Sequence, residues 1–110
     1  MNRNESVLTK IYKDKTVVFI IRGEIDHHSL KNVKTVIDSE IFVKRPDKLT
    51  LDLSGVNFMD SSGLGLILGR YQLATRLGIG FSLLEPSPAV SKLVKLAGCE
   101  KIINIERKSS

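Results

Sequence analysis

The chain opens with two short runs of β-branched and apolar residues. Residues 6–12 and 16–21 read SVLTKIY and TVVFII, and the polar segment KDK separates them. Runs of this kind predict β-strands, and the short polar connection predicts that they pair as a hairpin. The second run is apolar on both faces, so we expect it to lie inside the sheet.

The middle of the chain carries two helical patterns. Apolar residues recur at helical spacing over 30–41, Asp26 is placed to cap the free amides of the first turn, and Pro46 follows the end. The second pattern covers 61–77 and ends before Gly78, which suits a left-handed cap. We therefore expect a helix over each of these segments.

A third helix has clear boundaries closer to the C-terminus. Ser87 is a favoured N-cap, Pro88 suits the first helical position, and Gly98 follows the last turn. Its apolar face consists of Val90, Leu93, Val94 and Ala97.

Strand patterns separate these helices. Residues 49–56 alternate briefly and then reach Ser54 and Gly55, which predicts a buried strand followed by a loop. Residues 79–85 predict a further strand, and residues 102–105 predict a short one at the edge. Because strand, helix and strand follow one another, we expect parallel crossover connections.

The composition favours one domain. With 110 residues, of which 42% are hydrophobic, the chain can enclose a single core. We therefore expect one α/β domain over 1–107, with a mixed, mostly parallel sheet of four to five strands, an opening hairpin and covering helices. A disordered polar tail is expected over 108–110.

Charge, cysteine content and hydropathy exclude several classes. The formal net charge is +5, but the basic residues are scattered and aromatic residues make up only 5% with no Trp, so we expect no direct nucleic-acid binding. Cys99 is the only cysteine, which argues against a disulfide or zinc site, and we expect no metal or cofactor. The apolar stretches are shorter than the roughly 20 residues that span a bilayer, and the N-terminus lacks a signal-peptide core. We expect a cytoplasmic protein without stable membrane insertion.

The segment 58–71 carries the candidate chemistry. Asp60, Ser61 and Ser62 stand at the predicted start of the second helix, where backbone amides lack partners and Ser and Asp are favoured caps. A capping role alone would explain any one of them. The tandem hydroxyl beside Gly63 also offers a kinase an accessible acceptor, and a phosphate on Ser61 would add about −1.5 to −2 charges. We therefore single out Ser61 as a candidate phosphorylation site.

The same helix is unusual in its glycines. Gly63, Gly65 and Gly69 each lower helix stability by roughly 1 kcal/mol relative to alanine. Leu64 and Leu66 fall on different sides of the helix. Either the helix is buried on most sides, or a partner approaches its backbone closely. We expect Leu64 and Leu66 to provide apolar contacts to a partner.

Acidic residues precede the first helix. Glu24 and Asp26 follow the second strand, and the carboxyl ends of parallel strands open on the same edge of a sheet, so we expect both near Ser61. His27 and His28 are adjacent and would diverge on a helix, which argues against a metal site. The spacing around Ser61 matches neither the nucleophile elbow of a hydrolase nor a phosphate-binding loop.

Together these motifs resemble those of the STAS-domain anti-sigma factor antagonists. The segments FMDSSGLG, LGRY, GEIDHH and PSPAV, which begin at Phe58, Leu68, Gly23 and Pro86, carry the resemblance. It extends from the opening hairpin to about Ile105. Within that family the pattern is most similar to the sporulation branch, whose member acts on the anti-sigma-F factor.

The resemblance implies a partner switch. The unphosphorylated antagonist would bind an anti-sigma factor that is also a serine kinase with bound ATP or ADP, and would so free a sigma factor for transcription. That kinase would phosphorylate Ser61 and release the antagonist, and a serine phosphatase would reset it. The resemblance implies neither an enzymatic activity nor a cofactor. The implied partner-binding residues are Glu24, Asp26, Asp60, Ser62, Gly63, Leu64 and Arg70.

The chain departs from the family pattern in two respects. Related chains commonly carry a further C-terminal helix, whereas this one ends in the polar segment 107–110, and its net charge of +5 contrasts with the acidic balance common among them. Two alternatives stay open. One is a nucleotide-binding STAS domain that uses the same edge, and the other is a scaffold subunit of a stress-sensing assembly.

Overall fold

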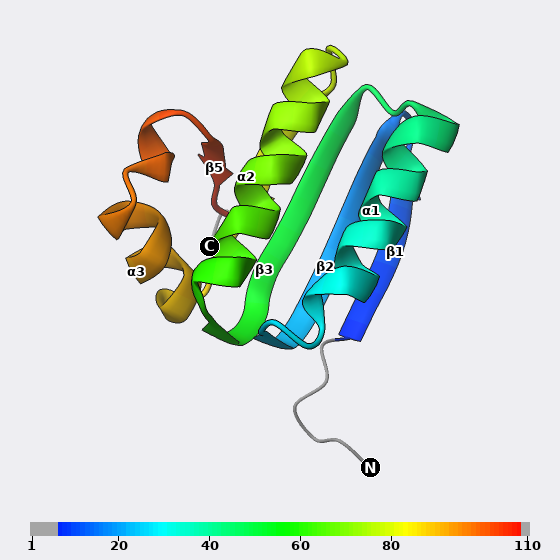
Figure 1. Cartoon of the computed structure of the whole chain (residues 1–110). Coiled ribbons are helices and arrows are strands. Elements are labelled where there is room, and N and C mark those ends of the chain that lie inside the picture. Colours follow the sequence, from blue (N-terminus) through cyan, green and yellow to red (C-terminus); the bar gives the residue numbers. More distant parts are fainter. Residues whose placement is uncertain (1–6, 109–110) are drawn as a thin grey trace.

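The structure is a computed structural model that describes residues 7–108. Two strands come first, and helices then alternate with strands to the end of the described chain (Figure 1). The elements are β1 Val7–Lys13, β2 Thr16–Ile25, α1 Leu30–Lys44, β3 Lys48–Met59, α2 Ser61–Arg76, β4 Gly80–Leu84, α3 Pro88–Leu96, the 3-10 helix η1 Cys99–Lys101 and β5 Asn104–Glu106.

The strands form one mixed sheet in the order β1-β2-β3-β4-β5. Strand β1 pairs with β2 antiparallel, and the remaining neighbours pair parallel. Figure 1 shows α1 and α2 side by side over one face of the sheet, with α3 beside α2. The predicted single α/β domain with an opening hairpin is therefore confirmed, and β2 lies inside the sheet as expected.

The core lies between this sheet face and the helices. Alternate residues of the inner strands point into it because successive side chains of a strand face opposite ways. The fully buried residues that meet there include Phe19, Ile21, Leu49, Leu51 and Leu83 from the strands and Val33, Ile37, Ile67, Ala74 and Val90 from the helices.

Strand β3 is longer than its sequence pattern predicts. The expected loop at Ser54 and Gly55 is wrong, because β3 continues to Met59. Strand β2 also continues, through Gly23 with its positive φ of 94°, and the two strands stay paired across two register shifts. Gly55 is needed there, since a Cβ at that position would lie 2.8 Å from Cγ of Arg22. The ends of β2 and β3 therefore project beyond β4, which pairs only with the first part of β3.

Helix α1 begins later than the position of Asp26 suggests. It starts at Leu30 after a turn over 27–29, and Ser29 occupies the N-cap without a side-chain capping bond. Oδ1 of Asp26 instead accepts hydrogen bonds from the backbone N–H groups of His28, at 3.0 Å, and Ser29, at 3.1 Å. Asp26 thus stabilises the turn before the helix rather than the helix itself.

The other helix ends agree with the sequence pattern. Gly78 and Gly98 both have a φ of 73°, and Ser87 caps the first turn of α3 through its hydroxyl. Of the polar tail expected over 108–110, the structure describes Lys108 only, so that expectation lies outside the described residues. No helix within residues 7–108 combines the length and the apolar character needed to cross a bilayer.

Polar contacts on the opposite face of the sheet fasten the short strand β5. The hydroxyls of Thr50 and Ser82 lie 3.0 Å apart and link β3 to β4. The Nζ atom of Lys48 reaches across β4 to the carboxylate of Glu106 in β5. A strand of three residues thereby gains a fixed position at the edge of the sheet.

Candidate functional site

The ends of β2 and β3 bring most of the predicted site residues together. Glu24 pairs with Phe58 and Ile25 with Met59, and the N–H of Asp60 donates to the carbonyl of Ile25 at 3.4 Å. The predicted convergence of the acidic segment that carries Glu24 and Asp26 with the serine loop is therefore confirmed. The surface formed by Glu24, Asp26, Phe58, Asp60 and Ser61 is called the serine edge below.

Asp60 starts helix α2. Its backbone is extended, with φ −100° and ψ −175°, and its Oδ1 atom accepts hydrogen bonds from the N–H groups of Ser62, at 2.9 Å, and Gly63, at 3.2 Å. This is the geometry of an N-cap, which satisfies first-turn amides that would otherwise lack partners. Because Asp60 caps the helix, the hydroxyl of Ser61 is not required for that purpose.

Ser61 offers a free hydroxyl at the first position of α2. The residue is exposed, and within residues 7–108 its hydroxyl makes no hydrogen bond. Ser62 is only partly exposed. Another protein could therefore reach the Ser61 oxygen without unfolding the helix, and Ser61 is the more accessible of the two serines.

Gly63 lets the first turn of α2 pack directly on the strand ends. A Cβ at this position would lie 2.6 Å from Cγ of Met59, 3.0 Å from Cγ2 of Ile25 and 3.3 Å from the Ile25 carbonyl oxygen. Only a residue without a side chain fits there. By contrast, a Cβ on Gly65 or Gly69 would meet nothing within 4 Å. The close packing at Gly63 fixes where Ser61 stands.

We expect Gly63→Ala to destabilise the fold by about 1–3 kcal/mol, because the added methyl group overfills the contact with Met59 and Ile25. Thermal or urea unfolding measures the change. Gly65→Ala is the matched control on the same helix and should stabilise by about 0.5–1 kcal/mol, since helical propensity rises and space is open. Equal effects of the two substitutions would contradict this account of Gly63.

Negative charge gathers at the serine edge. Glu24, Asp26 and Asp60 all lie at the paired strand ends. The hydrogen bond from the Ser29 amide, helped by that from His28, lowers the pKa of the Asp26 carboxyl from its ordinary value of 3.8, although desolvation acts in the opposite direction. Asp26 is therefore ionised at neutral pH, and a phosphate on Ser61 would join negative charge already present.

The lowered pKa of Asp26 has a consequence for the pH dependence of stability. The folded state favours the ionised form, so the contribution of Asp26 is present above a pH of about 4 and is lost as the pH falls through the lower folded pKa. We expect Asp26→Asn to lower Tm at about pH 7 and to have a smaller effect at about pH 2.5. Melting curves of the variant and the unmodified chain at both pH values test this. A difference in Tm between the two proteins that is the same at both pH values would contradict it.

The two leucines expected at an interface have different positions. Leu66 is 4% exposed and belongs to the hydrophobic core, so the expectation that it contacts a partner is wrong. Its side of α2 faces the sheet and the neighbouring helices. Leu64 is half-buried and lies one turn from the exposed Ser61. Of the two, only Leu64 retains surface next to the serine edge.

Arg70 lies away from the serine edge. It is 8% exposed, and its Nε atom stands 2.8 Å from Oδ1 of Asp38 on α1. Along α2 it is nine residues beyond Ser61, about 13 Å at the helical rise. The structure therefore places Arg70 in the contact between α1 and α2, and not among the other predicted partner-binding residues.

Sequence reasoning missed Phe58 as a candidate contact. Its side chain is 47% exposed and lies on β3 opposite Glu24. Exposed aromatic residues are enriched at protein interfaces. The usable signal was a large apolar residue three positions before Ser61, but the predicted loop after Gly55 obscured its place on a strand.

Metal binding finds no support within residues 7–108. No group of three or more His, Cys, Asp or Glu side chains there is arranged to hold a metal ion. His27 and His28 are both exposed in the turn before α1.

Comparison with known proteins gives consistent matches over most of the chain. The family model described as STAS domain matches residues 7–110. An anti-sigma F factor antagonist of Paenibacillus polymyxa is 39% identical over 90 residues, which are 80% of this chain and 77% of that protein. The unphosphorylated form of the anti-sigma factor antagonist SpoIIAA superposes with a TM-score of 0.82 at 28% identity, covering 94% of this chain and 90% of that one. The phosphorylated form of SpoIIAA from Bacillus gives a TM-score of 0.77 at 28% identity, covering 94% and 93%.

Proposed function

This chain belongs to the STAS domain family, and we propose that it is an anti-sigma factor antagonist that binds an anti-sigma factor while Ser61 is unphosphorylated. Binding would free the sigma factor that the anti-sigma factor otherwise holds. The similarity to proteins named anti-sigma F factor antagonists supports this role. Its place of action would be the cytoplasm, where transcription takes place.

The anti-sigma factor would also be a serine kinase that switches the antagonist off. The Ser61 oxygen would attack the γ-phosphorus of the kinase's bound ATP, the bond to the β-phosphate oxygen would break, and ADP would leave. The hydroxyl proton would pass to a base of the kinase. A separate serine phosphatase would return Ser61 to its hydroxyl form with water as the nucleophile. The observation that carries this proposal is the free, exposed hydroxyl of Ser61 at the start of α2.

The serine edge would form the centre of the contact with the anti-sigma factor. Phe58, three residues before Ser61, and the exposed part of Leu64, three residues after it, provide apolar surface. Gly65 leaves the α2 backbone open to close approach by the partner. Glu24 and Asp26 would face basic groups of the partner. Asp60, Ser62 and Gly63 would act mainly by fixing the position of Ser61.

Phosphate on Ser61 would oppose this contact strongly. The N–H groups of Ser62, Gly63 and Leu64 in the first turn of α2 are already bonded to Asp60, so these three are not free to receive the phosphate oxygens. The dianion would also lie beside the carboxylates of Asp60 and Asp26. Only solvent or basic groups of the partner could therefore stabilise its charge. In a desolvated interface that accommodates a neutral hydroxyl, removing the phosphate dianion from water would cost much free energy.

Arg70 would support the switch from a distance. Its ion pair with Asp38 joins α2 to α1, and α1 follows the turn that carries Asp26. We therefore assign Arg70 a positioning role between the two helices rather than a direct contact with the partner.

Incubation with the anti-sigma kinase and ATP tests the proposal. Intact-mass and peptide analysis should find one phosphate on Ser61 in the unmodified chain and none in Ser61→Ala, with loss of the complex only in the former. If the chain binds the kinase but gains no phosphate, the proposed phosphorylation switch is contradicted and the chain is a constitutive antagonist. If the chain is neither bound nor phosphorylated by the kinase, the antagonist role is overturned. Saturable ATP binding by the isolated chain would then favour the nucleotide-binding alternative.

A further inference from the structure

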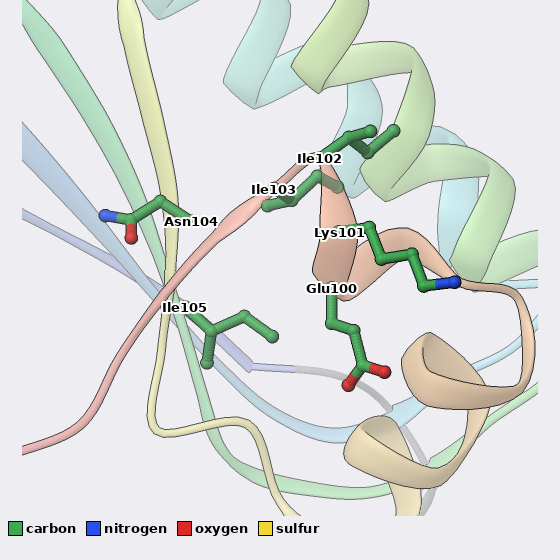
Figure 2. Close-up of a pocket in the computed structure, with 6 residues that line it drawn as sticks. All are labelled: Glu100, Lys101, Ile102, Ile103, Asn104 and Ile105. Atoms are coloured by element: carbon green, nitrogen blue, oxygen red, sulfur yellow. The ribbon is translucent and has the colours of Figure 1, made fainter.

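A hollow of about 340 Å³ lies between α3 and β5. Pro88, Ile105 and the almost fully buried Val94 provide its apolar lining, and Lys92, Lys95 and Arg107 stand around it. A shallower depression lined by residues 100–105 adjoins it (Figure 2). Figure 2 shows Asn104 on one side of β5 and Ile105 with Glu100 on the other. Lys92, Val94, Lys95, Ile105 and Arg107 are called the α3–β5 surface below.

Positive charge dominates the α3–β5 surface. Lys92, Lys95 and Arg107 are exposed, as is Lys101 in the adjoining depression. Among the residues that the structure describes, none of these cations lies within ion-pair distance of a carboxylate. Glu100 is the one acidic residue that lines the hollow. Unneutralised cations around an apolar lining attract a ligand that carries both negative charge and an apolar group.

The walls of the hollow are held in place by the fold. The N–H of Ser87 donates to the carbonyl of Leu53, which ties the start of α3 to β3 at 3.2 Å. An Nη1 hydrogen bond from Arg107 to the carbonyl of Pro86, at 3.5 Å, joins the segment after β5 to the segment before α3. The ion pair of Glu106 fixes β5 itself. A ligand would therefore meet a preformed site, which reduces the entropy lost on binding.

The hollow and the serine edge are formed by different elements, the hollow by α3 and β5 and the serine edge by the ends of β2 and β3 with the start of α2. Helix α3 begins at the level of Leu53 on β3, while Ser61 follows the end of that strand at Met59. The residues that line the hollow and the residues that form the serine edge are different. A ligand bound at the α3–β5 surface would thus contact none of the serine-edge residues.

We propose that the α3–β5 surface is a second docking site, and that its ligand is an acidic segment of a partner protein with at least one apolar side chain. The apolar side chain enters the hollow over Val94 and Ile105, and carboxylates meet Lys92, Lys95 and Arg107. This inference does not depend on the role proposed for Ser61. It accounts for a basic surface on a molecule whose serine edge is acidic.

A labelled peptide tests the second docking site directly. The probe is a fluorescein-labelled peptide of about twelve residues made of Glu, Leu and Ala, and its twin carries Lys in place of Glu. We expect saturable binding of the acidic probe only. The double substitution Lys92→Glu with Lys95→Glu should lower the affinity for this probe by at least about tenfold. Lys31→Glu with Lys34→Glu on α1 is the matched control, with the same spacing, exposure and charge change, and should alter affinity by less than about twofold.

A second measurement uses the unmodified chain. Titration with the acidic probe should shift the backbone NMR signals of α3 and β5 and leave those of Ser61 unchanged, and Ser61→Asp should bind the probe with unchanged affinity. Equal loss of binding in both double variants would overturn the proposal, because it would indicate general charge attraction. Binding of phosphatidylserine vesicles without binding of the peptide would also overturn it, in favour of a membrane surface.

Discussion

Ser61→Asp should weaken binding to the anti-sigma factor by about 100-fold or more, whereas Ser61→Ala should bind within about threefold of the unmodified chain. The aspartate places a permanent charge beside Asp60 and Asp26, where the N–H groups of the next three residues are already bonded to Asp60. Alanine removes only a hydroxyl that makes no hydrogen bond within the described chain. Calorimetric titration of each variant with the anti-sigma factor measures the difference.

The control for this prediction places the same charge elsewhere. Ser39 is exposed on α1, away from the serine edge, so Ser39→Asp should leave the affinity nearly unchanged. Raising the salt concentration should recover part of the binding lost in Ser61→Asp, because screening weakens charge repulsion at a partly exposed site. If Ser61→Asp and Ser61→Ala bind equally well, charge at Ser61 does not control the complex.

Arg70→Ala should lower the free energy of unfolding by about 2–3 kcal/mol and Tm by roughly 10 °C. The guanidinium lies between α1 and α2 with its Nε atom 2.8 Å from Oδ1 of Asp38. Removing it leaves a largely buried carboxylate without its cation and also removes the packing of the arginine stem. Asp38 keeps some contact with solvent, so the expected loss is below that of a fully enclosed pair. Urea unfolding followed by circular dichroism provides the measurement.

Arg76→Ala is the matched control for this substitution. Arg76 is exposed in the last turn of the same helix, so its replacement should change stability by less than about 0.5 kcal/mol. The double substitution Asp38→Leu with Arg70→Met should recover most of the loss, because an apolar pair of similar volume replaces the ion pair. A cost for Arg70→Ala no greater than that for Arg76→Ala would rule out a structural role for the ion pair.

Much of the fold follows from local patterns in the sequence. The caps of α3 at Ser87 and Gly98, and the positive φ of Gly78, depend on residues that satisfy nearby backbone groups. Such interactions act over a few positions and can therefore be read along the chain. The meeting of Glu24 with the Ser61 loop required one further step, because it follows from the parallel pairing of the strands that carry them.

Positions decided by tertiary packing could not be read in the same way. The extension of β3 past Ser54 and Gly55 depends on pairing with β2, and Gly55 only appears to be a loop residue until Arg22 is seen to occupy its side-chain space. From the sequence alone, the side chains of Leu66 and Arg70 could each be assigned to a partner interface or to the interior. The neighbouring sheet and α1 decide this, since they cover one side of α2 and leave Gly65 open.

The strand order of the sheet has a kinetic consequence. Each strand pairs with the strand that precedes or follows it in the chain. The members of a pair are separated only by a tight turn, by one α-helix or, between β4 and β5, by α3 and the short 3-10 helix η1. Little loop-closure entropy is therefore lost before the contacts of each new strand pair stabilise it. The sheet can grow outward from the β1–β2 hairpin by adding one strand at a time. A chain of this topology should refold faster than a β-sandwich of equal length, and a molecule that has transiently unfolded spends correspondingly little time with its core exposed.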